Sequence, residues 1–295
     1  MMSVKSIPLK TELNGKEASF IPFFPQMTTC EFTEIPCGSG ILSESAFLCG
    51  FVLRNTRKEP VEYPIIPDTC TALVFLQTDR HIAGWFCGTS DSLRKLQLEP
   101  GDSVAVLRFK PGDTRVPFVG ELGGLTNRSL NLTDGFPEGE NLLRIMEKDL
   151  TMEERALLLT GQLQRTRLQP EAVQLLHHCM DLIIRAHGNI RISEVAGNTG
   201  FSERYIGKVF ERMIGLSPKL YSEMIRMQYA VRQLRNREEQ KSLLELSMDC
   251  GYFDHAHMNR EFNKFLKCSA GNLRKKGFAV IDMNRIEPYI HRSEG

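Results

Sequence analysis

Two stretches in the C-terminal half combine cationic and amide side chains at helical spacing. Arg204 and Lys208 are four residues apart, so on a helix they project from one face, one turn apart. Asn259 and Arg260 lie in a second stretch of similar pattern. Guanidinium and ammonium groups bind guanine edges and phosphates, and an asparagine amide suits adenine. These residue types at this spacing indicate contact with nucleic acid.

Both stretches belong to a pattern that the sequence contains twice, at residues 193–221 and 244–273. In each copy a short amphipathic segment precedes a glycine, Gly200 or Gly251, and a longer amphipathic segment follows it. The second copy has one extra residue after its glycine. Short helix, glycine turn and longer helix form the pattern of a helix-turn-helix. Two such units about 50 residues apart predict one chain that touches DNA twice.

In the first unit, Gly200 supplies a left-handed turn and Ser202 caps the longer helix. The residues expected on its inner face are Ile206, Val209, Phe210 and Met213. Arg204, Gly207, Lys208 and Glu211 face outward, and the N-terminal turns of such a helix enter the major groove. Gly207 offers no side chain, which indicates either a close approach to the duplex or weak readout.

In the second unit, Asp254 is the expected capping residue, and Met258 and Phe262 face inward. The residues expected to face outward are His255, Ala256, Asn259 and Arg260. For Arg260 a buried intramolecular ion pair is an alternative. Residues 215–236 predict a turn and then a long helix that joins the units, and its Arg226, Arg232 and Arg235 are interpreted as solvated surface in preference to phosphate contacts. Residues 171–188, after Pro170, predict a further helix.

The N-terminal half has a different pattern. Short runs rich in β-branched and aromatic residues predict strands over 41–54, 59–67, 71–76, 81–88 and 103–109. Several strands without intervening helices favour a β-sandwich or small barrel. Helical spacing then appears over 140–150 and 151–168, where Thr151 and Glu154 form a capping box. The second helix serves either as a linker or for dimerisation.

A small barrel can hold one small ligand, and four residues are candidates for its wall. They are Phe75, Trp85, Cys87 and Arg108. Arg108 lies in an apolar strand, where alternation favours a solvent-facing position. An inward Arg108 would need an anionic partner or a buried acid. For Trp85, a position in the core is favoured over contact with a ligand.

The eight cysteines contain no C-x-x-C pair, and Cys30 and Cys37 are too widely spaced for a usual zinc site. His177 and His178 are adjacent and would point in different directions on a helix. Small buried thiols are therefore the favoured interpretation, with a redox or metal role as the alternative. No catalytic triad, phosphate loop or carboxylate pair is visible. We expect no metal, no cofactor and no enzymatic activity.

The composition is that of a globular protein, with 41% hydrophobic and 25% charged residues and a net charge of +1. Residues 1–167 contain 18 Lys and Arg against 21 Asp and Glu, whereas residues 168–276 contain 17 against 12. The C-terminal half is thus the basic one, as a polyanion-binding module requires. Without an apolar run of membrane length or a signal peptide, the sequence predicts a cytoplasmic protein with no membrane contact.

Three motifs carry a family resemblance: LSPKLY after a helix-turn-helix, RMxxAVRQL, and DxGYxDxxHMNREFxK. Over about Glu171 to Lys276 the chain closely resembles the DNA-binding domain of the AraC/XylS transcription regulators. The resemblance implies base-reading roles for Arg204, Gly207 and Lys208, and for the corresponding positions in the second unit, His255, Ala256 and Asn259. Ala270 departs from the usual proline. The IPDTCTALVF, LRFKPGD and LNLTD segments resemble the cupin-like sensor domain of one branch of the family.

The sequence therefore predicts an α+β protein of two domains. The expected organisation is a β-rich, cupin-like sensor over 1–138, a helical linker over 139–169, a double helix-turn-helix over 170–276 and a tail over 277–295. The expected function is sequence-specific DNA-binding transcription regulation, controlled by a small effector or by dimerisation.

The expected DNA contacts are Arg204, Gly207, Lys208, Arg212, His255, Ala256, Asn259 and Arg260. Expected partners are double-stranded DNA, a small-molecule effector, a second copy of the chain and RNA polymerase. The alternatives are a DNA-repair alkyl-acceptor enzyme with the same tail, and a ligand- or partner-binding protein with weakened DNA contacts.

Overall fold

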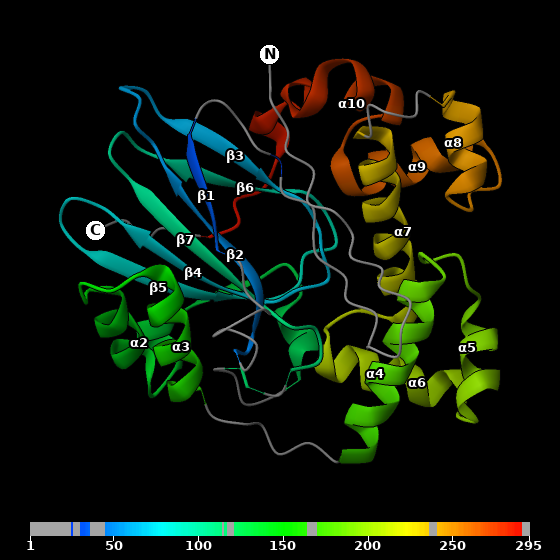
Figure 1. Ribbon diagram of the computed structural model, residues 1–295, viewed down its shortest axis with the longest axis horizontal. Coiled ribbons are helices and arrows are strands. Elements are labelled where there is room, and N and C mark those ends of the chain that lie inside the picture. Colours follow the sequence, from blue (N-terminus) through cyan, green and yellow to red (C-terminus); the bar gives the residue numbers. More distant parts are fainter. Residues whose placement is uncertain are drawn as a thin grey trace.

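A computed structural model describes residue 25 and residues 30–35, 45–113, 115–116, 121–163, 170–235 and 241–290. In Figure 1 the strands occupy one half of the molecule and helices α4 to α10 the other. The predicted division into a β-rich part and an all-α part is therefore confirmed.

The N-terminal half is built on two sheets. A six-stranded antiparallel sheet has the order β1-β2-β7-β4-β5-β8, and a second sheet pairs β3 with β6. The strands are β1 (Glu31–Ile35), β2 (Phe47–Arg54), β3 (Val61–Ile65), β4 (Ala72–Gln77), β5 (Ile82–Cys87), β6 (Arg94–Leu98), β7 (Ser103–Phe109) and β8 (Ser129–Asn131). Of the two expected architectures, the sandwich is the one found among the described residues.

Alternation along the strands gives the larger sheet two buried faces. Val74, Trp85 and Val106 face the β3–β6 sheet and form a core between the two sheets. Phe75 and Phe86 point to the opposite face, which α2 (Gly139–Met146) and α3 (Met152–Gln162) cover. Figure 1 shows α2 and α3 beside β5 of this sheet. Both faces are apolar because both are covered.

The helices after the sheet begin with the expected signals. α1 (Leu132–Gly135) is capped by Asn131, and α3 starts with a complete capping box between Thr151 and Glu154. The expected helix over 140–150 ends four residues early, at Met146. Residues 164–169, the end of the predicted linker, lie outside the described residues.

The C-terminal half packs seven described helices around one core. They are α4 (Pro170–Arg185), α5 (Ile192–Thr199), α6 (Glu203–Met213), α7 (Pro218–Arg235), α8 (Leu243–Asp249), α9 (His255–Leu266) and α10 (Ala270–Lys276). The core takes residues from every one of these helices, and α7 runs between the two units. The long joining helix predicted over 215–236 is confirmed.

The two halves are joined through polar contacts as well as shared core. The Thr89 hydroxyl donates to the Ile214 carbonyl oxygen at 3.2 Å, and the Gln228 amide donates to the Pro67 carbonyl oxygen at 2.7 Å. The Leu93 backbone N–H donates to the Phe265 carbonyl oxygen at 2.9 Å. The first contact reaches the end of α6 and the third the end of α9, so the β-rich half contacts both helix-turn-helix units.

Candidate nucleic-acid interface and ligand cluster

The first helix-turn-helix has the local geometry that its sequence predicts. Gly200 ends α5 with a φ of 74°, and the Ser202 hydroxyl accepts a hydrogen bond from the Tyr205 backbone N–H. Ile206 and Phe210 are buried in the common core. The turn and cap thus fix the start of α6, and its apolar face fixes its rotation.

The residues predicted to read DNA from α6 lie on its open side. Arg204, Lys208 and Arg212 are exposed, and Gly207 is half-buried. A Cβ at Gly207 would meet nothing within 4 Å, so no contact within the protein requires glycine there. The exposed aromatic rings of Phe201 and Tyr205 stack on each other at the start of this helix, with centroids 5.4 Å apart.

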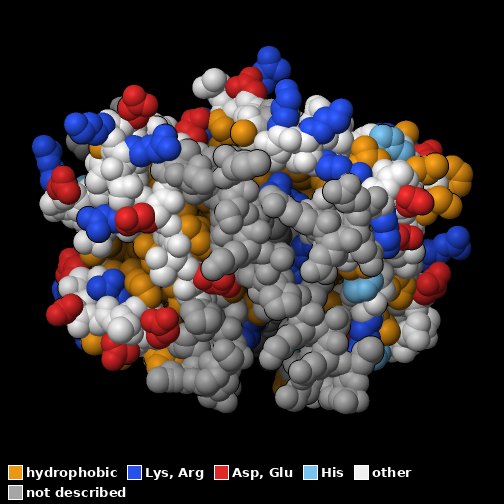
Figure 2. All heavy atoms as spheres, turned by 45° about the horizontal axis from the view of Figure 1, so that its top comes forward, with side chains coloured by type: hydrophobic (Ala, Val, Ile, Leu, Met, Phe, Trp, Pro, Cys, Tyr) orange, Lys and Arg blue, Asp and Glu red, His pale blue; other side chains and the backbone are white. Residues whose placement is uncertain are grey.

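The second unit repeats this arrangement with one difference. Ser242 and Glu245 form a capping box at α8, Gly251 has a φ of 75°, and Asp254 caps α9 by accepting from the His257 backbone N–H. The residue that makes this copy longer, Phe253, precedes the cap and is 90% exposed. In Figure 2, hydrophobic side chains reach the surface at the right-hand edge, the side on which α8 and α9 lie in Figure 1.

The outward residues of α9 differ in what they contact. Ala256 and Arg260 are exposed, and Arg260 forms no ion pair with any residue that the structure describes. The alternative of a buried Arg260 pair is therefore wrong within the described residues. Asn259 is half-buried: its Oδ1 accepts from the Ala270 backbone N–H and its Nδ2 lies 3.1 Å from His255 Nε2. A bidentate adenine contact would have to use the second lone pair of Oδ1 and the second hydrogen of Nδ2.

The departure at Ala270 has a structural counterpart. A proline at that position would have no backbone N–H, and the hydrogen bond to Asn259 would be lost. Ala270 is the first residue of α10, so this bond holds the start of α10 against α9. The substitution is consistent with a second unit in which Asn259 positions helices.

Sequence reasoning missed the ion pair that seats α9 on α7. Arg226, expected at the surface, pairs with the buried Glu261, and its guanidinium lies 5.0 Å from the centre of the Tyr252 ring. Glu261 Oε1 is also 3.6 Å from His257 Nε2. Burial opposes the charge on Arg226, but hydrogen bonding to Glu261 leaves its pKa raised. The sequence signal for this pair was an acidic residue at an inward position, since Glu261 lies three residues after Met258 and four before Phe265.

The surface interpretation of Arg232 is likewise wrong. This side chain is half-buried, and burial lowers its pKa to about 10. Arg235, also half-buried, is not a fully solvated residue either. Arg226, Arg232 and Arg235 are thus all partly buried within the protein.

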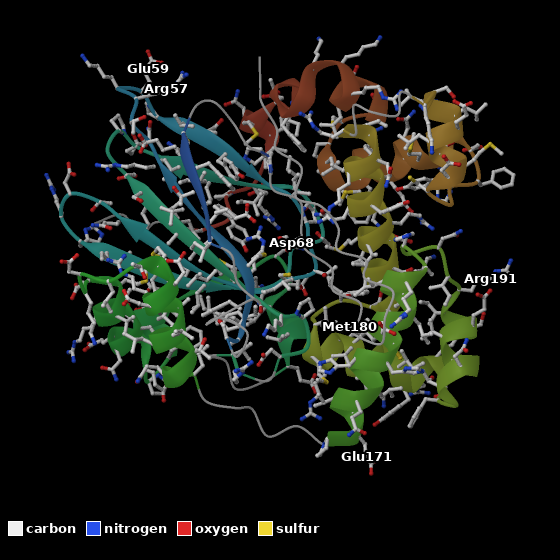
Figure 3. The ribbon with its side chains drawn as sticks, viewed as in Figure 1. Arg57, Glu59, Asp68, Glu171, Met180 and Arg191 are labelled. Atoms are coloured by element: carbon white, nitrogen blue, oxygen red, sulfur yellow. The ribbon has the colours of Figure 1, made fainter. Side chains whose placement is uncertain are left out.

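In the N-terminal half, Arg108 points into the core between the two sheets. It is 2% exposed and pairs with the carboxylate of Asp68, so the favoured solvent-facing interpretation was wrong. The alternative of a buried acid is the one the structure shows. Burial raises the pKa of Asp68, whereas attraction to Arg108 acts in the opposite direction. Figure 3 shows Asp68 near the middle of the molecule, where the sheets approach the helices.

The structure brings together three of the four predicted ligand residues. Trp85 and Cys87 face the same core as Arg108. Phe75 points to the opposite face of the sheet, because it is one residue out of step with Val74, which pairs with Trp85. Trp85 was expected to be a core residue, and it is buried.

Most of the described thiols are buried, and burial raises the pKa of five of them, namely Cys70, Cys87, Cys179, Cys250 and Cys268. Cys49, Cys70, Cys87, Cys179, Cys250 and Cys268 are buried, and Cys30 is half-buried. Burial raises the pKa of Cys179 and Cys268 to about 11, and that of Cys87 further. An alkyl-acceptor cysteine reacts as a thiolate, so this environment disfavours the repair-enzyme alternative.

Two further searches concern the described part of the chain. It contains no group of three or more His, Cys, Asp or Glu side chains placed to hold a metal ion. Within the same residues, no helix combines the length and the apolar character of a membrane span. Cys37 lies outside the described residues.

Comparison with known proteins defines the class of the C-terminal half. Residues 195–276 match the family model described as helix-turn-helix domain, so the predicted helix-turn-helix domain is confirmed. Over 91 residues the chain is 33% identical to the HTH-type transcriptional regulator Rv1931c of Mycobacterium tuberculosis. The match covers 31% of this chain and 34% of that protein, so the chain spans about a third of the curated relative it matches.

Solved structures of ToxT from Vibrio cholerae are similar over more of the chain. The 1.65 Å structure shares 10% identity, with a TM-score of 0.42, over 76% of this chain and 97% of that chain. ToxT bound to an unsaturated fatty acid shares 12% identity, with a TM-score of 0.40, over 76% and 94%.

Proposed function

We propose that this protein is a sequence-specific DNA-binding transcription regulator. The observation that carries the proposal is the repeated helix-turn-helix, in which α6 and α9 are both capped and both packed on α7. The helix-turn-helix family match covers both units. A helix of this kind places its N-terminal turns in the major groove, so one chain presents two reading helices.

The two helices should read different sequences. α6 offers Arg204 and Lys208 around a glycine, whereas α9 offers Ala256 and Arg260, with His255 and Asn259 held to each other. Arg and Lys bind guanine edges or phosphates, and an alanine methyl suits the thymine methyl. We therefore expect an asymmetric site for each chain, and a palindrome only where two copies bind.

The N-terminal half is proposed to control DNA binding through a small effector or through dimerisation. Its contacts with the ends of α6 and α9 give it a physical route to both reading helices. The dimer role of α3, contact with RNA polymerase, the lack of catalytic activity and a cytoplasmic location belong to the same proposal.

The test is selection of a binding sequence from random duplexes with the full chain, followed by binding measurements on variants. Arg204→Ala, Lys208→Ala and Arg260→Ala should each weaken binding by about 1–3 kcal/mol where the side chain reads a base. For a phosphate contact, the slope of log affinity against log salt should fall by about 1.

Arg57→Ala and Lys58→Ala are matched controls. Both residues are exposed in the turn between β2 and β3, and Figure 3 shows Arg57 on the other side of the molecule from α6 and α9. These controls should bind as the unaltered chain does. If no sequence is selected, or if the three substitutions weaken binding no more than the controls, the proposal fails.

A further inference from the structure

The chain after the helix-turn-helix domain returns to the β-rich half. The described part of the tail, residues 277–290, passes through two short 3-10 helices, Gly277–Val280 and Met283–Arg285, and then runs along β6. The Lys95 backbone N–H donates to the Glu287 carbonyl oxygen at 3.1 Å, and the Tyr289 N–H donates to the Lys95 carbonyl oxygen at 2.8 Å. The bridge between Lys95 and Pro288 is parallel, so the tail adds to this sheet as a strand would.

The end of the tail enters the core between the sheets. Tyr289 and Ile290 are buried in the same cluster as Trp85 and Cys87. The Cys87 thiol donates to the Tyr289 carbonyl oxygen at 3.9 Å, and Arg108 is close enough to influence the Tyr289 phenol electrostatically. The tail therefore occupies the place where the sequence predicted ligand-wall residues.

The other end of the tail belongs to the helical half. Phe278, Ile281 and Ile286 are buried in the core of the helix-turn-helix domain. The Lys95 ammonium group donates to the Met283 carbonyl oxygen at 2.9 Å and pairs with Glu62 at 2.5 Å. Residues 277–290 are thus held by both halves of the protein. Withdrawal of this segment from the β-rich half would loosen the connection between the two halves.

We propose that Tyr289 and Ile290 are the built-in occupant of the effector site, and that the effector is a neutral aromatic or phenolic small molecule that displaces them. The proposal rests on effector control, as proposed above. Displacement withdraws the tail from the sandwich while its first part stays in the helical core, and so changes how the DNA-binding domain is held.

The chemistry of the site carries the choice of ligand. Among the described residues, the charged groups beside this cluster are Arg108 and Asp68, and they pair with each other. A charged ligand would therefore enter an apolar site whose described charges are already paired. The remaining walls include an indole, thiols and aliphatic side chains. Burial raises the pKa of Tyr289 well above its ordinary value, so the present occupant is a neutral phenol.

The first experiment uses p-cresol, which has the shape of a tyrosine side chain, and the fluorescence of Trp85, the one tryptophan of the chain. In the unaltered chain p-cresol competes with a tethered segment at an effective concentration in the millimolar range. Tyr289→Ala removes that competitor and leaves a matching space. The variant should bind p-cresol at least about tenfold more tightly, and Tyr205→Ala, a control at an exposed ring, should bind as the unaltered chain does.

The second experiment keeps the native sequence, so it does not depend on how a variant folds. Arg285 lies in the tail with its side chain 86% exposed and offers trypsin a cleavage site that requires local opening. Saturating p-cresol should accelerate cleavage after Arg285, and cleavage after Arg57 should not change. Equal p-cresol affinity in the Tyr289→Ala and unaltered chains, or p-cresol binding without faster cleavage after Arg285, refutes the proposal.

Neither readout involves DNA, so the two proposals fail separately. If the chain selects no DNA sequence but shows both p-cresol effects, DNA-binding regulation is refuted and the effector site is supported. If the chain binds a selected DNA sequence but shows neither p-cresol effect, the effector site is refuted and DNA-binding regulation is supported.

Discussion

Gly200 and Gly251 occupy equivalent turns in the two units but have different surroundings. Their φ angles are 74° and 75°, so an alanine at either position adopts the same left-handed conformation at a cost of about 1–2 kcal/mol. A Cβ at Gly200 would meet nothing within 4 Å. A Cβ at Gly251 would lie 2.4 Å from Asn189 Cγ and 2.7 Å from Asn189 Cβ. The second turn therefore packs on the segment that leads into the first unit.

Gly251→Ala should consequently destabilise the protein more than Gly200→Ala. The steric overlap adds about 1–3 kcal/mol, the usual cost of overpacking, because Asn189 Cβ cannot move without its backbone. The conformational cost is common to both variants and cancels in their difference. The free energy of unfolding from denaturant titration measures that difference, and hydrogen exchange of α8 and α9 amides locates it.

Asn189→Gly removes the overlapping atoms and supplies the control. Combined with Gly251→Ala, it should recover most of the difference between the two alanine variants, measured relative to Asn189→Gly alone. Equal destabilisation by Gly200→Ala and Gly251→Ala would show that the second turn does not rest on Asn189. The inference that the turn of the second unit packs on the segment leading into the first unit would then be wrong.

Three further predictions concern the helical half. Arg226→Ala removes the arginine partner of the buried Glu261 carboxylate, while His257 Nε2 stays 3.6 Å from it, and should lower the free energy of unfolding by about 3–5 kcal/mol. Arg226→Met combined with Glu261→Met should restore most of this loss, and a loss below about 1 kcal/mol in Arg226→Ala contradicts the pair. Gly207→Ala should raise the free energy of unfolding by about 1 kcal/mol in denaturant titration, because alanine favours the helix and its Cβ meets no neighbour. Weaker binding of this variant to the selected DNA would indicate that α6 approaches the duplex closely at Gly207, whereas unchanged binding would indicate weak readout there. Burial lowers the pKa of His187, whose ring stacks on Tyr229 with centroids 4.0 Å apart. As the pH falls, the unfolded chain therefore binds a proton on His187 before the folded chain does, and the free energy of unfolding should decrease below the unfolded pKa of about 6.5. His187→Asn should reduce this decrease in denaturant titrations at several pH values, and an unchanged decrease rules out His187 as its source.

The helix-turn-helix units could be predicted in detail because their signals are local. Ser202 and Asp254 cap helices through backbone N–H groups three residues away, and Gly200 and Gly251 end helices through their own φ angles. The apolar faces of α6 and α9 follow from helical periodicity alone. Five strands were visible for the same reason, as short apolar runs bounded by turn residues.

The remaining features depend on partners that are distant in the sequence. β6 is polar at Arg94, Lys95 and Gln97, and its role as a strand comes from pairing with β3 and with the tail. Arg108 was assigned to solvent because Asp68, 40 residues away, could not be recognised as its partner.

The side chain of Arg226 was misjudged for the same reason, because its partner Glu261 lies on another helix. Asn259 also has a partner on another helix, the Ala270 backbone N–H, and its contact with DNA stays a prediction. Phe75 and Trp85 lie on opposite faces of the sheet because Trp85 pairs with Val74 and not with Phe75, and this register depends on strand pairing. Pairing register and side-chain partners therefore limited the prediction of the site more than helix and strand recognition did.

Hydroxyl-radical footprinting of a single chain on its selected duplex tests most directly whether both α6 and α9 read DNA. The account predicts two protected segments about one helical turn apart on one face of the duplex. Lys208→Ala should weaken protection in one segment and Arg260→Ala in the other, whereas Arg57→Ala should change neither. A single protected segment, or equal loss of both segments in each variant, would contradict the claim that the two units read DNA separately.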